Sequence, residues 1–394
     1  MRRWNGVRAT SAIAMLAAFA AACGNEIARA DDLTDPILTK APQIPTKDPA
    51  WPGFAMTMGD HDGSHATIPA GVYGAAMVPA GHFMFSYTPS FMHMSGNYIG
   101  SSQVSPDTIV TTVATPPGTM MNGMAVPFYR IVPQSMEMDM HMFHAMYGVT
   151  DWLSLMAMGT YEYKSMSMTT YAGAMGTRVL GTSSASTEGF GDTMVSSLWR
   201  VYQDPVNHVH INLGLSLPSG STTETINMLS PMGTFMNMRA NYGMQLGTGT
   251  VDFAPGVSYT GHLQQWSWGA AYRGRFALDN NTEGYHYGNL TDLTGWAGYS
   301  WIHGVTTTFR AEGMIQGSIS GADPAIMGLM QGTNPNFYGG QRINLYGGIE
   351  LDGSLVGLKR TYLAVEGGAP VYQNLNGPQL GEAWQINVAL RIGL

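Results

Sequence analysis

The last eleven residues of the chain, WQINVALRIGL, alternate strictly between apolar and polar positions. Trp384, Ile386 and Val388 begin the apolar row, while Gln385 and Asn387 begin the other. A period of two places the two rows on opposite faces of a β-strand. Eleven residues is also about the length that crosses a bilayer as a tilted strand, so the segment predicts a transmembrane β-strand.

The same alternation recurs along the chain, for example in HVHINLGLSL (208–217) and TVDFAPGVSYT (250–260). The predicted strands are 82–99, 135–147, 152–164, 189–201, 208–218, 250–261, 266–278, 289–302, 305–318, 341–351, 361–372 and 384–394. The connections between these twelve strands alternate between long and short, which is typical of outer-membrane barrels with long outer loops and short periplasmic turns. An even number of strands brings both termini of the chain to the periplasmic side.

The pattern predicts an all-β fold, a transmembrane antiparallel up-and-down β-barrel of about twelve strands over residues 81–394. A soluble propeller or sandwich is the alternative, but the polar face of a soluble sheet is usually charged, and here it is mostly small or neutral. A sheet in lipid must also close, because no water satisfies a free edge. Residues 31–80 are irregular and rich in proline, and we interpret them as a periplasmic or lumenal segment.

The first thirty residues have the pattern of a secretory signal. Arg2, Arg3 and Arg8 precede an apolar run, and the sequence ARA ending at Ala30 has the small-x-small form of a cleavage site. Cys23, the only cysteine, lies in AAACG, which is faintly similar to a lipoprotein cleavage site, so lipidation remains an open alternative. Export together with a barrel predicts the bacterial outer membrane, reached with the help of its assembly machinery.

Composition narrows the possible functions. Only 11% of the residues are charged, 50 are glycine and 30 are methionine. Without residues 1–30, which hold four of the 18 basic and one of the 26 acidic residues, acids outnumber bases by 25 to 14, so nucleic acid is not an expected partner. The expected partners are outer-membrane lipid and a small solute or metal ion. Neither a phosphate loop nor a compact nucleophile-and-histidine motif is present, and we predict no enzymatic activity.

Several runs of the sequence resemble one family, the bacterial outer-membrane barrels described as transporters of the phenol-degradation meta-pathway, and especially a methionine- and histidine-rich branch of it. These runs are 81–97, 135–158, 187–202, 208–221, 244–261, 265–270, 321–324 and 370–385. They follow the family's order over roughly residues 70 to 394. The resemblance implies a barrel that passes aromatic or hydrophobic compounds.

One segment departs from the family's pattern. Relatives read Gly-Val-Met-Gly-Asp-His-x-His before the first strand, whereas this chain reads GVYGAAM over residues 71–77. A ligand role for that Asp-His pair therefore does not carry over to these positions. A similar cluster lies upstream in MTMGDHDGSH (56–65), which contains His61 and His65.

The cost of burying charge in hydrocarbon predicts which face of each strand points inward. A basic group facing the bilayer midplane costs about 2–4 kcal/mol, and an acid somewhat less. In SMEMDMHMFHAM (135–146) this rule places Glu137, Asp139 and His141 in the lumen and the four methionines between 136 and 142 on the lipid side. In the next strand it places Met156 and Met158 in the lumen.

Applied to five neighbouring strands, the rule predicts a lumenal wall of thioethers, imidazoles and carboxylates. Such groups suit copper ions. The candidate metal ligands are His141, Asp139, Met156, Met158, His208, His210, Met92 and Met94, with His61 and His65 upstream. The alternative is that methionine is a compositional habit, since the chain also uses it in segments such as NMLSPMGTFMNM (227–238).

The other half of the barrel is predicted to carry a ladder of charges in the lumen. Its members are Arg273, Arg275, Arg310, Glu312, Arg342, Glu350, Glu366 and Arg391. The mixed signs favour ion pairs that fill the interior over an anion pathway. The sequence thus predicts an outer-membrane channel or transporter for a small solute, either an aromatic or hydrophobic compound or a soft metal ion such as copper. The alternative is a non-transporting barrel with a structural or metal-binding role in copper handling.

Overall fold

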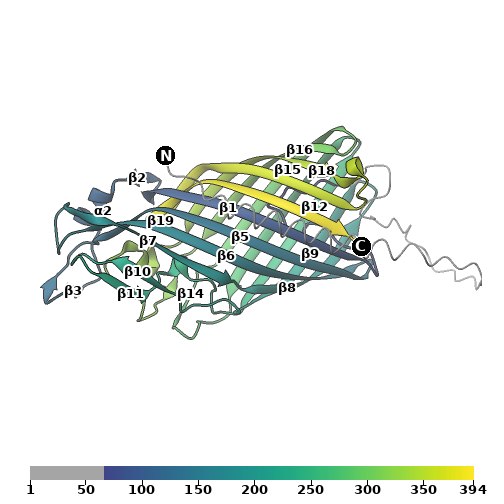
Figure 1. Ribbon diagram of the computed structural model, residues 1–394. Helices are drawn as coiled ribbons and strands as arrows, with labels where there is room; N and C mark the ends of the chain where they lie inside the picture. Colours follow the sequence, from purple (N-terminus) through teal and green to yellow (C-terminus); the bar gives the residue numbers. More distant parts are fainter. Residues whose placement is uncertain (1–65) are drawn as a thin grey trace, which may run out of the picture. The chain divides into compact units, whose positions relative to one another are not determined.

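The computed structural model describes residues 66–394, which form a closed antiparallel β-barrel, as predicted (Figure 1). The predicted signal segment, His61 and His65 lie outside the described residues. Eleven strand elements form the ring, and pairing of the first with the last closes it. In chain order they are β1 (Phe83–Gly100), β5 (Ile131–Thr150), β6 (Leu153–Tyr171), β8 (Thr193–Gln203), β9 (Asn207–Leu217), β12 (Asp252–Leu263), β13 (Trp266–Ala277), β15 (Leu290–Ile302), β16 (Val305–Gln316), β18 (Gly340–Asp352) and β19 (Thr361–Gly393).

The last element, β19, doubles back on itself. Its first part, up to Leu375, pairs with β18, and its second part pairs with β1. The two parts lie against each other. The side-chain amide of Gln373 in the first part donates to the carbonyl of Glu382 in the second at 3.0 Å, and its oxygen accepts from the amide of Glu382 at 2.9 Å. Every pair in the ring is antiparallel. A closed ring of antiparallel neighbours needs an even number of strands. Ten single strands and the two arms of β19 give twelve.

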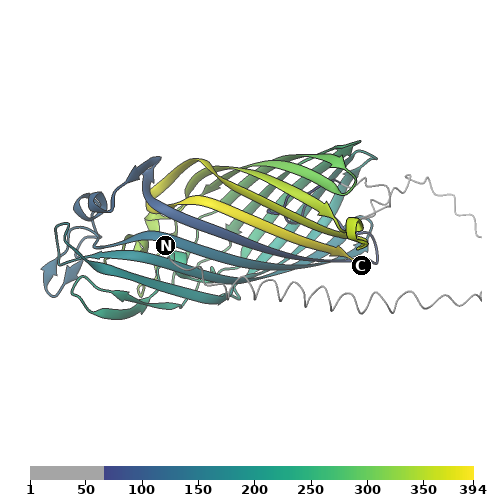
Figure 2. The ribbon, with the colours of Figure 1, turned by 45° about the horizontal axis from the view of Figure 1, so that its top comes forward.

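The two ends of the barrel differ in the length of their connections. At one end, β5 and β6 are joined by residues 151–152, and β15 and β16 by residues 303–304. We call this the short-turn end, and the C-terminus lies there (Figure 1). The opposite end, the long-loop end, carries the helix α2 (Pro106–Thr112), drawn in dark blue in Figure 2. The predicted rhythm of long and short connections is confirmed.

The loops contain structure that the alternation did not predict. The small elements are β2 (Ser102–Val104), β3 (Met120–Met121), β4 (Met124–Ala125), β7 (Val179–Phe190), β10 (Thr225–Leu229), β11 (Phe235–Arg239), η1 (Tyr242–Met244), β14 (Tyr285–His286), β17 (Ser320–Gly321), η2 (Gln331–Thr333) and η3 (Pro335–Phe337), with η4 (Gly353–Val356) at the short-turn end. β7 pairs with the part of β6 near the long-loop end, and β8 pairs with the other part. The predicted strand 189–201 therefore begins in β7 and ends in β8.

The alternation of exposed and buried positions matches the predicted faces in all but one of the barrel strands. In the last arm of β19, Trp384 and Ile386 are exposed while Asn387 and Ala389 are buried. Within residues 66–394, no helix is long and apolar enough to cross a membrane.

The exception is β5, which faces the opposite way from the prediction. No bulge interrupts its pairing with β1 between Ser135 and Tyr147, so its side chains alternate strictly. His144 and Met146 are only 5% and 2% exposed and line a cavity inside the barrel. Phe143 and Tyr147 are 42% and 37% exposed. The odd-numbered positions of β5 therefore face outward.

Glu137, Asp139 and His141 thus lie on the outer face, and the prediction that they face the lumen was wrong. The methionines at the even positions 136–142 point inward instead. The charge rule failed because it holds only within hydrocarbon, which about 9–11 residues of a strand cross, whereas β5 has 20 residues. Glu137 and Asp139 lie in the half of β5 near the long-loop end. His141 accepts or donates a 2.7 Å hydrogen bond with the hydroxyl of Tyr87 on the same outer face.

This reversal can be checked by cysteine labelling of a chain in which Cys23 is replaced by serine. We expect a cysteine at position 139 to react quickly with a maleimide carrying a bulky polyethylene glycol chain, because it lies on the outside of the barrel. A cysteine at position 140 should react slowly, because it points into a filled lumen. Equal rates, or faster reaction at position 140, would show that β5 has the originally predicted phase.

Candidate functional site

The lumen is the candidate site, and it is occupied by the chain itself. Residues 66–80, which we call the plug segment, precede β1 and lie against the inward faces of strands around the ring. On one side, the indole of Trp296 on β15 donates to the carbonyl of Thr67 at 2.9 Å. On the other, the hydroxyl of Ser154 on β6 lies 3.1 Å from both the amide and the carbonyl of Val78.

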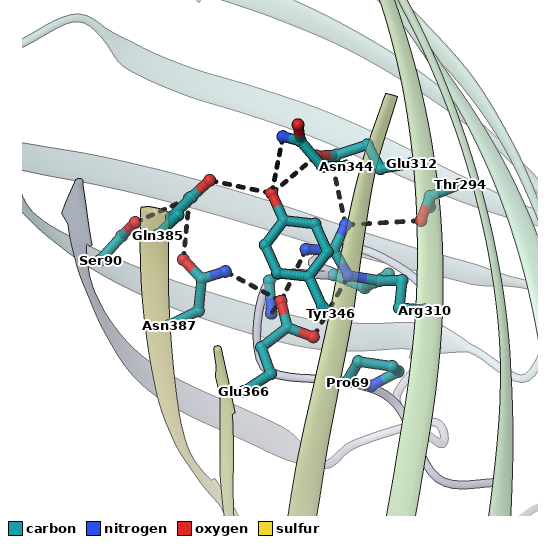
Figure 3. Close-up of polar contacts among 12 residues, drawn as sticks. Pro69, Ser90, Thr294, Arg310, Glu312, Asn344, Tyr346, Glu366, Gln385 and Asn387 are labelled. Atoms are coloured by element: carbon teal, nitrogen blue, oxygen red, sulfur yellow. Dashed lines mark hydrogen bonds and ion pairs between the residues drawn. The ribbon is translucent and has the colours of Figure 1, made fainter. Parts of the chain in front are cut away.

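Two charged side chains of β19 hold the first half of the plug segment. The guanidinium of Arg391 donates to the carbonyls of Ile68 and Pro69 at 2.8 and 2.9 Å. The carboxylate of Glu366 accepts from the amide of Gly71 at 3.0 Å. Backbone groups without regular secondary structure must find partners when buried, and lumenal side chains supply them here. Figure 3 shows Pro69 beside the polar side chains of this region.

The second half of the plug segment is held through the carbonyl of Gly74. Nε2 of His210 lies 2.8 Å from this oxygen, and the amide of Asn212 donates to it at 3.1 Å. Nδ1 of His210 lies 3.0 Å from Nε2 of His208. With His210 donating to Gly74, the geometry requires His208 to donate to His210. Both ring nitrogens of His210 are therefore hydrogen-bonded, Nε2 to the plug segment and Nδ1 to His208.

Buried ion pairs fill the lumen beside β16, β18 and β19 (Figure 3). The guanidinium of Arg310, which is 2% exposed, contacts Glu366 at 2.6 Å and Glu312 at 2.8 Å. It also lies 3.8 Å from the ring centre of Tyr346, whose hydroxyl donates to Glu312 at 3.1 Å. Asn387 donates to the same Glu366 carboxylate at 2.8 Å. Each charge thus has an opposite charge and further hydrogen bonds.

The other arginines of the predicted ladder are also paired with acids. The pairs are Arg273 with Asp292 at 2.5 Å, Arg275 with Asp252 at 3.3 Å, Arg342 with Glu382 at 3.0 Å and Arg391 with Glu350 at 3.4 Å. Arg273 also stacks over Tyr73 of the plug segment at 4.4 Å. This arrangement favours the interpretation of the ladder as ion pairs that fill the interior.

The opposite wall of the lumen is rich in methionine. Met84, Met146 and Met156 form a buried cluster with Met77 of the plug segment and Leu198 of β8. They are direct neighbours across β1, β5 and β6, since Met146 pairs with both of the others. We call this group the lower methionine cluster.

A second group of methionines lies toward the long-loop end. Met136, Met166 and Met168 of β5 and β6 pack with Met244 and Met330 from the loops. We call it the upper methionine cluster. It includes Met228 of the segment 227–238, and the loops here cover the inward faces of β5 and β6. Methionine in this part of the chain serves as ordinary core packing.

The structure places the predicted metal ligands in several different regions. Met156, Met158, His208 and His210 point inward, as predicted, from β6 and β9. Met92 and Met94 also point inward, but from the part of β1 near the upper cluster. His141 and Asp139 lie outside the barrel. Within residues 66–394, no group of three or more His, Cys, Asp and Glu side chains is arranged to hold a metal ion.

His144 is a lumenal residue that the sequence reasoning missed. Its ring stacks on Tyr73 of the plug segment, with 5.7 Å between the ring centres. Both of its ring nitrogens are buried without a hydrogen-bond partner. His144 lies on the same face of β5 as the inward methionines. Because the sequence prediction assigned that face to lipid, it did not identify His144 as lumenal.

The long loops are themselves packed together. Tyr242, Tyr285, Ile319 and Ile326 form a buried cluster contributed by three loops. Burial raises the pKa of Tyr242 and of Tyr285, so both hydroxyls stay protonated at neutral pH.

At the base of another loop, the buried guanidinium of Arg130 donates to carbonyls, among them those of Ala172 and Gly176 at 3.0 and 2.8 Å. Burial lowers its pKa.

Comparison with solved structures finds the same barrel fold in an outer-membrane channel. The COG4313 outer membrane channel from Pseudomonas putida F1 superposes with a TM-score of 0.50 and 11% identity, over 82% of this chain and 99% of that one. The Ralstonia pickettii toluene transporter TbuX matches with a TM-score of 0.40 and 11% identity, over 80% and 90% of the two chains. No family model matches the sequence, and no curated protein does.

The ion-pair network makes a testable contribution to stability. We expect Glu366→Gln to lower the free energy of unfolding by about 3–5 kcal/mol, because it leaves the buried Arg310 guanidinium without one of its two carboxylates. Glu137→Gln, on the exposed outer face of β5, should change it by about 0.5 kcal/mol or less. Urea titration of both variants in lipid vesicles measures the difference. A similar small effect for both variants would contradict the structural role of the network.

Proposed function

We propose that this protein is an outer-membrane channel for a small solute, held closed by its plug segment. The observation that carries the proposal is the placement of residues 66–80 inside a closed barrel of the channel type. A lumen that accommodates an irregular segment of this length becomes a passage when the segment leaves. The plug segment is bound through hydrogen bonds of its backbone, which water can replace, and through apolar contacts of Ile68, Val72 and Met77.

The proposed solute is an aromatic or other small hydrophobic compound. Two observations support this class. The sequence resembles transporters of the phenol-degradation meta-pathway, and we propose that the chain belongs with that family in the outer membrane of a Gram-negative bacterium. In the lumen, the lower methionine cluster together with Tyr73 and Trp296 offers apolar and aromatic surface along the plug segment. A soft metal ion is the second candidate for the cargo.

The competing proposal is a barrel that does not transport and instead serves a structural or metal-binding role. The extensive filling of the lumen by ion pairs and by the plug segment favours it. The two proposals differ in what happens when the plug segment is removed. A channel then conducts, and a purely structural barrel, which the ion pairs fill, does not.

Removal of the plug segment provides the test. We expect a variant that lacks residues 66–78 to show a several-fold higher conductance in planar bilayers than the full chain, and faster swelling of liposomes in small solutes. Phenol-type compounds should enter such liposomes faster than sugars of similar size. If the deletion variant folds but neither conducts nor speeds swelling, the channel proposal is rejected. The proposal of a structural or metal-binding barrel then stands.

A point substitution tests the same idea with a matched control. A Cβ atom on Gly71 would lie 2.7 Å from both Arg310 and Asn387 and still closer to Glu366. Gly71→Ala should therefore loosen the plug segment and raise the conductance. Gly347→Ala, where a Cβ meets nothing within 4 Å, should leave the conductance at the level of the unmodified chain. Equal conductance for the two variants would contradict a closing role for the contacts of Gly71.

A further inference from the structure

A small cavity lies where the plug segment meets β1, β5 and β6. Its volume is about 30 Å³, room for two or three water molecules, since one water needs roughly 10–15 Å³. Met84, Met146 and Met156 line it, and His144 does so as well. None of these methionines is more than 7% exposed.

The positions of these four side chains follow from the register. Met84, Met146 and Met156 are direct cross-strand neighbours on one face, and such neighbours have Cβ atoms about 4.5–5.5 Å apart. His144 lies two residues before Met146 on the same face of β5. Three methionine side chains and an imidazole therefore line one space, and Tyr73 of the plug segment lines it as well.

His144 separates this cavity from ordinary methionine packing. The upper methionine cluster is also buried, and its methionines pack against apolar residues. In the lower cluster, an imidazole that is 5% exposed has no partner for either nitrogen. Buried polar groups normally have partners, and the cavity beside this imidazole is lined by three methionines. A ligand that binds both imidazole and thioether would complete the site.

We propose that Met84, Met146, Met156 and His144 form a binding site for the soft monovalent cation Cu(I). Thioether and imidazole are ligands that suit Cu(I), and a site without carboxylates discriminates against hard divalent ions. Arg391 also lines the cavity, but its guanidinium is directed toward the carbonyls of the plug segment and toward Glu350. The site is distinct from the sequence-based candidates, of which it includes only Met156. It does not depend on conduction by the barrel.

The test is Cu(I) titration of the refolded full chain in detergent, without oxygen and against a chromogenic Cu(I) chelator. We expect a variant with Met84, Met146 and Met156 all changed to leucine to bind one equivalent fewer than the unmodified chain. The matched control changes Met136, Met166 and Met168 of the upper cluster to leucine and should keep that equivalent. X-ray absorption of the bound ion should show sulfur and nitrogen neighbours, and His144→Phe should remove the nitrogen.

If the triple variant does not refold, as judged by its far-ultraviolet circular dichroism, two single variants decide the question. Met156→Leu and His144→Phe are each expected to weaken Cu(I) binding about tenfold. Unchanged binding in these variants, or an equal loss in the upper-cluster control, overturns the proposal. A chain that binds no Cu(I) overturns it as well and indicates water bridging His144 to Ser86 or Thr88. Because the titration needs no membrane, its outcome is independent of the channel test.

Discussion

The structure depends on one constraint, that a peptide group inside a bilayer must find its hydrogen-bond partner within the protein. Strands satisfy this constraint only when the sheet has no free edge. The pairing of β1 with β19 joins the first strand of the sheet to the last and leaves no free edge. A closed ring of antiparallel neighbours requires an even number of strands. The two antiparallel arms of β19 count as two strands and make the number even. The outer face of the closed barrel can then be apolar. Buried polar side chains and the backbone of the plug segment find their hydrogen-bond partners in the lumen.

Inside the barrel, the same demand is met in two different ways. Along β16, β18 and β19, arginines and acids neutralise one another, as Arg310 does with Glu312 and Glu366. Along β1, β5 and β6, thioethers pack without needing partners. The plug segment joins the two halves, because its carbonyls accept from Arg391 on one side and from His210 on the other. Its backbone and the lumenal side chains thus satisfy each other.

The strands could be predicted from the sequence because lipid imposes a simple alternation, and every predicted span overlaps a strand. The charge rule also oriented β16 and β18 correctly, since Arg310 and Glu350 are buried inside the barrel. It failed for β5, where Glu137 and Asp139 lie on the outer face in the half of the strand near the long-loop end. That single error concealed His144. The course of residues 66–80 was not predictable either, because single hydrogen bonds from distant strands hold an irregular segment and leave no periodic signal.

The attachment of the plug segment also determines the path by which it can move. Gly81 joins it to β1 at the short-turn end, where its amide donates to the carbonyl of Gly148 at 2.8 Å. The segment is thus tethered at the same end of the barrel as the C-terminus. A plug segment released from its lumenal contacts would leave through that mouth and stay attached to β1, and the ladders between neighbouring strands would stay intact. Opening at the short-turn end would then need no rearrangement of the loops at the far end.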